Sequence, residues 1–122
     1  DFICTHLRRA HHWAVMQLEN YGYGKLNWAQ IFADTSLDFC DVARALRRCE
    51  RAGIETRLYN FPLCTVPVEL RARAAKSISD WKQKYLPDCE GCQQRQICCG
   101  FFEWYNVDAG FARISPLSGV PA

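Results

Sequence analysis

Cysteine is the residue type through which this sequence is most able to do chemistry. Eight of its 122 residues are cysteines, and Cys89, Cys92, Cys98 and Cys99 all lie between positions 89 and 99. Dense clustering suits a metal or a metal cluster better than a disulfide framework, because several thiolates can then reach one centre. Disulfides and reduced structural thiols are the two alternatives.

The local spacing supplies three convergent thiolates. Residues 89–92 form a C-x2-C turn, in which Gly91 permits a tight backbone, and Cys98 follows. Adjacent cysteines usually point apart, so Cys99 is only an alternate ligand. A four-iron cluster takes four thiolates, and the best candidate for the fourth is Cys64, in a proline-bounded loop at the exit of a predicted strand. Structural zinc also takes four thiolates and is nearly as well supported by spacing alone.

The remaining cysteines are expected to be structural. Free cysteine is among the most buried residue types, and this interpretation covers Cys4, Cys40 and Cys49. Of these, Cys49 lies on the apolar face of a predicted helix.

A polar loop provides a second candidate site. Gln17, Glu19 and Asn20 follow a short apolar run that reads as a buried strand. In parallel α/β folds, the loops after the carboxyl ends of strands build the active site. These three residues are therefore candidates for a binding pocket, and an ordinary polar loop is the alternative.

The sequence pattern predicts that the strands and the helix that position these residues form a βαβ unit. Residues 13–18 and 54–59 have the patterns of strands. Between them, apolar residues at helical spacing predict an amphipathic helix over about 39–52, ended by Gly53. A helix between two strands implies parallel pairing with a right-handed crossover. Residues 68–85 are predicted to be helical, with a break near Ser79.

Composition narrows the function classes. The net charge of +2 is too small to imply a nucleic-acid or membrane partner. No apolar run approaches the ~20 residues that a membrane span needs. The first residues show neither an initiator Met nor a signal-peptide pattern, as expected for a fragment of a longer chain. A chain that binds metal through thiolates is expected in the reducing cytoplasm.

Four segments carry a specific pattern, namely LYNFPLC (58–64), SISDWK (77–82), YLPDCEGC (85–92) and CCGFF (98–102), and residues 18–20, Gly22 and 27–28 add to it more loosely. Together they resemble the carboxy-terminal part of one family, the His-Xaa-Ser system radical SAM maturases. The resemblance covers about residues 13–105.

The resemblance implies an α/β fold of two parts. Residues 1–60 would be the terminal βαβ part of a partial (β/α) barrel, and residues 61–122 a small helical, cysteine-rich extension that carries an auxiliary cluster. It favours iron over zinc and implies a [4Fe–4S] cluster on the candidate ligands Cys64, Cys89, Cys92 and Cys98, with Cys99 as the alternate. Gln17, Glu19 and Asn20 would then lie in a pocket for S-adenosylmethionine or substrate.

The implied activity belongs to a full-length enzyme. That enzyme would bind S-adenosylmethionine and a second [4Fe–4S] cluster, and would modify a ribosomally made precursor peptide, with a partner maturase as a further expected partner. The C-x3-C-x2-C motif of the catalytic cluster is absent from this sequence, so this chain alone is not expected to catalyse the reaction. The alternative function is a stand-alone zinc- or cluster-binding interaction module.

Overall fold

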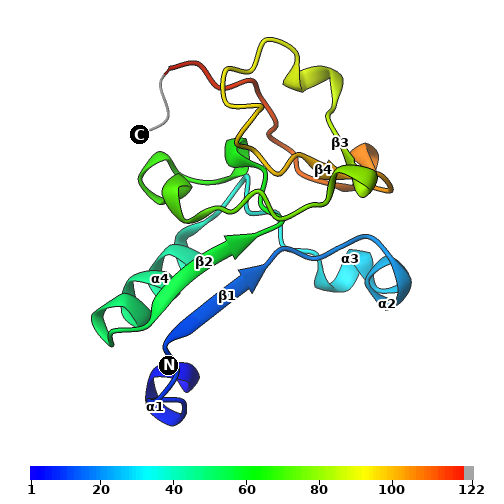
Figure 1. Cartoon of the computed structure of the whole chain (residues 1–122). Coiled ribbons are helices and arrows are strands. Elements are labelled where there is room, and N and C mark those ends of the chain that lie inside the picture. The colour runs from blue at the N-terminus through cyan, green and yellow to red at the C-terminus, as the bar shows by residue number, and fades with distance from the viewer. Residues whose placement is uncertain (120–122) are drawn as a thin grey trace.

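Two parallel strands, with a helix between them in the chain, form the frame of the structure. In the computed structural model, which describes residues 1–119, β1 (His12–Met16) pairs in parallel with β2 (Glu55–Tyr59). The helix α4 (Cys40–Arg51) packs against β2 (Figure 1). The predicted βαβ unit is confirmed, although β1 begins and ends slightly earlier than the predicted 13–18.

The helix α4 follows from its sequence pattern. Its apolar spacing buries Ala43, Leu46 and Cys49 on one face. Asp41 lies in the first turn and Arg51 in the last, an arrangement that complements the helix dipole. The helix ends before Gly53, whose φ of 77° lies in the left-handed region that glycine adopts without strain.

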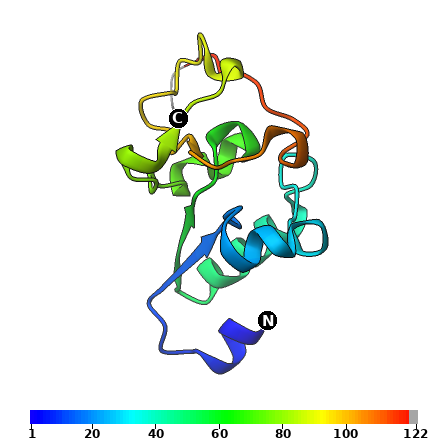
Figure 2. The ribbon, with the colours of Figure 1, turned by 90° about the vertical axis from the view of Figure 1, so that its right-hand side faces the viewer.

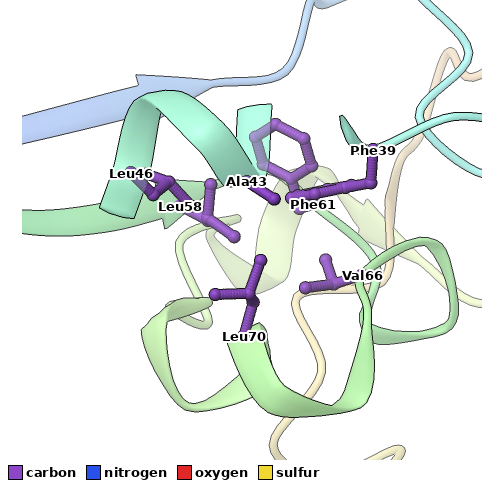
Figure 3. Packing of buried hydrophobic residues seen from close by; sticks show 7 residues of the cluster. All are labelled: Phe39, Ala43, Leu46, Leu58, Phe61, Val66 and Leu70. Atoms are coloured by element: carbon purple, nitrogen blue, oxygen red, sulfur yellow. The ribbon is translucent and has the colours of Figure 1, made fainter. Parts of the chain in front are cut away.

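The main hydrophobic core lies between α4, β2 and the chain that follows β2. Leu46 and Leu58 are fully buried at its centre, and the rings of Phe39 and Phe61 meet edge to face with centroids 5.9 Å apart. The core therefore draws residues from both sides of position 60. Figure 3 shows its members, Phe39, Ala43, Leu46, Leu58, Phe61, Val66 and Leu70.

The prediction of a helix over residues 68–85 is wrong. A 3₁₀ helix, η2 (Val68–Arg73), is followed by extended chain and by the 3₁₀ turn η3 (Asp80–Lys82). The physical reason is competition from β2. Ala74 forms a parallel bridge with Leu58, and the Ala75 amide donates to the Leu58 carbonyl at 2.9 Å. This segment therefore satisfies its backbone against the sheet instead of within a helix.

The other elements are short. Before α4 the chain forms α1 (Phe2–His6), α2 (Gly22–Leu26) and α3 (Trp28–Ile31). Near the cysteines, β3 (Gln83–Lys84) pairs antiparallel with β4 (Phe101–Phe102). The remaining 3₁₀ turns are η1 (Leu63–Thr65), η4 (Pro87–Cys89) and η5 (Val107–Ala109).

The cysteine-rich chain gathers at one end of the molecule. Figures 1 and 2 place the segment after η3 beyond the carboxyl ends of β1 and β2, with the N-terminus at the opposite end. Residues 1–119 thus form a small mixed α/β fold with two two-stranded sheets, and this part of the chain contains no barrel. None of its helices is long and apolar enough to cross a membrane.

We expect Leu58→Ala to lower the free energy of unfolding by about 2–5 kcal/mol, because it opens a cavity at the centre of the core. Urea unfolding of the metal-free chain measures this effect. Leu26 is 78% exposed, so Leu26→Ala is the matched control and should change stability by no more than about 0.5 kcal/mol. Equal effects of the two substitutions would contradict this account of the core.

Candidate metal centre

Cys64 is held in a short, rigid loop directly after β2. It lies in η1, between Pro62 and Pro67, and is partly buried. The Arg71 side chain closes the loop, because its Nε donates to the carbonyls of Leu63 at 3.1 Å and Val66 at 3.0 Å. Both backbone restriction by proline and these two hydrogen bonds fix the position from which Cys64 projects.

The other three candidate ligands lie on successive tight turns. Cys89 ends η4, and the Cys92 amide donates to the Cys89 carbonyl at 3.2 Å. Gly91 between them has a φ of 75°, the left-handed conformation that the C-x2-C motif predicts. The Cys98 amide then donates to the Gln94 carbonyl at 3.0 Å.

The structure brings these turns against the Cys64 loop. The Leu63 amide donates to the Cys98 sulfur at 3.3 Å, across 35 positions of sequence. The thiols also affect one another electrostatically: Cys98 and Cys89 act on Cys64, and Cys98 and Cys92 act on Cys89. The four sequence-predicted ligands therefore share one neighbourhood. Within residues 1–119, however, no three His, Cys, Asp or Glu side chains are arranged to hold a single metal ion.

Backbone amides face all four sulfurs. Cys98 accepts from the amides of Leu63 at 3.3 Å and Gly100 at 3.4 Å. Cys92 accepts from the Leu117 amide at 3.4 Å. Burial raises the pKa of both Cys64 and Cys89, and the amides of Ser115 and Leu86, respectively, oppose that rise. Hydrogen bonds of this kind stabilise a charged sulfur more than a neutral one.

The thiols differ in acidity. A hydrogen bond with the neighbouring Cys99 thiol and the amides of Leu63 and Gly100 outweigh burial and lower the pKa of Cys98 to about 6. Burial raises the pKa of Cys64 to about 11, against the Ser115 amide. Cys98 therefore gives up its proton more readily than Cys64, and a metal that binds Cys64 must displace the proton of that thiol.

Cys99 occupies a different environment from its neighbour. It is only 2% exposed and packs in an apolar cluster with Ile78 and Phe102. Its thiol donates to the Gly100 carbonyl at 3.3 Å, and the hydrogen bond with Cys98, together with burial, raises its pKa. In this arrangement Cys99 supports Cys98 as a hydrogen-bond partner and as a packing residue.

Residues 112–119 cover the site, a role that the sequence did not reveal. This tail is anchored first by the Ala112 amide, which donates to Asp34 Oδ2 at 2.8 Å. It then passes Cys64 and Cys92, to whose sulfurs the amides of Ser115 and Leu117 are directed. The side-chain sequence of this tail does not predict these contacts, because the backbone makes them.

The predicted polar loop contributes to a separate cavity. This cavity is small, with a volume of about 20 Å³, and lies after the ends of both strands. Gln17, Asn20 and Asn60 are among its lining residues, and Phe101 and Tyr105 form part of its wall. Gln17 is held in place by its own hydrogen bonds, since its Nε2 donates to Thr35 Oγ1 at 3.2 Å.

Asn20 is the unusual member of this loop. It is 9% exposed, and its Oδ1 has no hydrogen-bond partner among residues 1–119. A buried acceptor without a partner is costly, so such an atom calls for an explanation. Glu19 is partly exposed and does not line the cavity.

The cysteines predicted to be structural have different outcomes. Cys49 is 3% exposed, as predicted for the apolar face of α4. Cys40 is exposed, so its prediction as a packing residue is wrong: it is the first residue of α4 and lies outside the apolar face. Cys4 is partly exposed and lies beside Cys49.

No protein-family model matches this chain, and neither the curated proteins nor the solved structures include a match to it.

We expect Gly100→Ala to destabilise the metal-free chain. The added Cβ would lie 2.8 Å from the Lys84 carbonyl, and the φ of 66° disfavours an L side chain. The substitution must therefore move the β3–β4 pair and the amide that donates to Cys98. Gly53 is the control because it has a similar φ of 77° but open space around its Cβ position. Gly53→Ala should cost about 1–2 kcal/mol, and an equal or smaller cost for Gly100→Ala in urea unfolding would contradict this account.

Proposed function

We propose that this chain holds a [4Fe–4S] cluster on Cys64, Cys89, Cys92 and Cys98, as the carboxy-terminal part of a radical SAM enzyme that modifies a ribosomally made peptide. The main observation in support of an iron–sulfur cluster is the set of backbone amides directed at all four sulfurs. Amides around thiolate ligands offset the negative charge that the ligands bring and tune the reduction potential of iron–sulfur clusters.

The donor set suits an auxiliary cluster. Four thiolates can occupy every iron of a four-iron cluster, which then has no open coordination site for a substrate. Such a cluster would transfer electrons or stabilise the fold, and the catalytic cluster with S-adenosylmethionine would belong to the rest of the full-length enzyme. This assignment fits the absence of C-x3-C-x2-C from the sequence.

Further observations support the proposal that this chain is part of an enzyme. The parallel pair β1–β2 with α4 is the repeating unit of a (β/α) barrel, and the segments that resemble the maturase family surround the four cysteines. The cavity beside Asn20 opens after the carboxyl ends of both strands, where α/β enzymes bind their substrates. The precursor peptide, a partner maturase and a reducing cytoplasmic setting are parts of the same proposal.

The cluster is tested by metal content. We expect the chain, expressed and purified without oxygen, to hold about four irons and as much sulfide, and Cys64→Ala to lose most of both. Cys40→Ala is the matched control, because Cys40 is exposed on α4, and it should keep the full content. Iron, sulfide and zinc analysis with electron paramagnetic resonance provides the measurement.

Other metal contents would decide against the proposal in distinct ways. One zinc per chain without sulfide would replace the cluster by a structural zinc site and favour the stand-alone interaction module. Iron kept by Cys64→Ala but lost by Cys99→Ala would move the fourth ligand to Cys99.

Substitutions in and beside the cavity test the proposed enzymatic function. In the full-length protein we expect Asn20→Ala to lower turnover of the precursor peptide. Stability should change by no more than about 1 kcal/mol, because the oxygen removed has no partner among the described residues. Glu19→Ala, at the neighbouring residue outside the cavity lining, is the control. Unchanged turnover of the Asn20 variant would show that this loop has only a structural role.

A further inference from the structure

Two thiols meet at the end of the molecule far from the candidate metal centre. Cys4 lies in α1 and Cys49 in α4, and their sulfurs are 3.6 Å apart across 45 positions of sequence. A disulfide bond is only about 2.05 Å long, so both thiols are free, and a small movement of either side chain would bring them to bonding distance. We infer that Cys4 and Cys49 form a reversible redox modification site, which low-molecular-weight disulfides convert into a disulfide between α1 and α4.

The two cysteines are unequally accessible, and this sets the order of reaction. Cys49 is 3% exposed in the apolar face of α4, whereas Cys4 is partly exposed. Burial and the neighbouring Cys4 thiol also raise the pKa of Cys49. An incoming reagent therefore meets Cys4 first, and Cys49 is placed to complete the reaction from beneath it.

The reaction balances with a small disulfide as the oxidant. The Cys4 thiolate attacks one sulfur of oxidised glutathione, which forms a mixed disulfide and releases one glutathione thiolate. The Cys49 thiolate then attacks the Cys4 sulfur and displaces the second glutathione. Each cysteine loses one proton, the two protein thiols are oxidised together, and two molecules of glutathione leave reduced.

The bond would change how α1 is held. None of the five residues of α1 is buried. An ion pair between Asp1 and Arg48 also links the N-terminal end of the chain to α4, at 2.5 Å and with both side chains mostly exposed, and exposed pairs of this kind contribute little. A covalent link would add a constraint that α1 otherwise lacks, so oxidation would fix the N-terminal segment to the helix that carries the main core.

Cys40 distinguishes a specific site from general thiol reactivity. It belongs to the same helix as Cys49 but is exposed, and a hydrogen bond to Asp38 raises its pKa. It can take up glutathione as any exposed thiol can, yet no second thiol lies beside it to complete a disulfide, on the hydrogen bonds and contacts of residues 1–119.

The test is peptide mapping of the folded, full chain after exposure to oxidised glutathione and blocking of free thiols. Trypsin cuts after Arg8, Arg48 and Arg51, so the disulfide would appear as residues 1–8 linked to residues 49–51, at the mass of the two peptides less two hydrogens. We expect this linked species to be the main form of both peptides and to disappear with dithiothreitol. The Cys40→Ser variant should give the same result.

The variant Cys49→Ser should trap the first step, with glutathione retained on Cys4. Wild-type protein that also retains glutathione on Cys4, or that links Cys49 to any other cysteine, would overturn the proposal. So would a folded chain in which Cys4 and Cys49 both stay free while Cys40 reacts. Because the wild-type result stands alone, the test does not depend on the variants folding, and it is independent of the metal content of the other cysteines.

Discussion

The turn at the end of β2 is the constraint on which the rest of the structure depends. Asn60 adopts a φ of 65°, a conformation that asparagine tolerates better than most residues. The hydroxyl of Ser77 accepts from the Asn60 amide at 2.8 Å and donates to its side-chain oxygen at 2.9 Å. This pairing turns the chain out of the sheet, and it also ties the extended segment after η2 to the same point.

Both the core and the candidate metal centre follow from that turn. Immediately after it, Phe61 enters the main hydrophobic core, and Leu63 directs its amide at the Cys98 sulfur. Cys64 then projects from the same short loop. A change in the direction of the chain at Asn60 would move a core residue, a hydrogen-bond donor and a candidate ligand together. The stability of the core and the geometry of the candidate metal centre therefore depend on the same turn.

How far the sequence predicts the structure depends on whether the deciding contacts are local. The apolar spacing of α4 and the patterns of both strands reflect local burial, and these elements were predicted correctly. The segment after Leu70 was predicted wrongly as a helix. Its apolar residues have helical spacing, but Ala74 instead forms a bridge with Leu58. Local sequence patterns do not contain information on such a contact between distant chain segments.

The candidate site shows the same division. The tight turn at Gly91 was predictable, since C-x2-C spacing needs it. Nothing in the side chains of residues 112–119 pointed to the sulfurs, because the contribution of this tail is made by peptide groups that every residue except proline carries. The sequence also could not predict that Asn20 Oδ1 lacks a hydrogen-bond partner among the described residues, because that depends on the residues that surround it in the folded chain.

The position of this tail in the chain has a consequence for assembly. Protein synthesis proceeds from the amino end, so Cys64, Cys89, Cys92 and Cys98 all leave the ribosome before Ser115 and Leu117, whose amides face two of their sulfurs. On the nascent chain those two sulfurs are therefore uncovered for as long as the tail is still being made. A cofactor delivered during that interval would reach its ligands without first having to displace the segment that later closes over them.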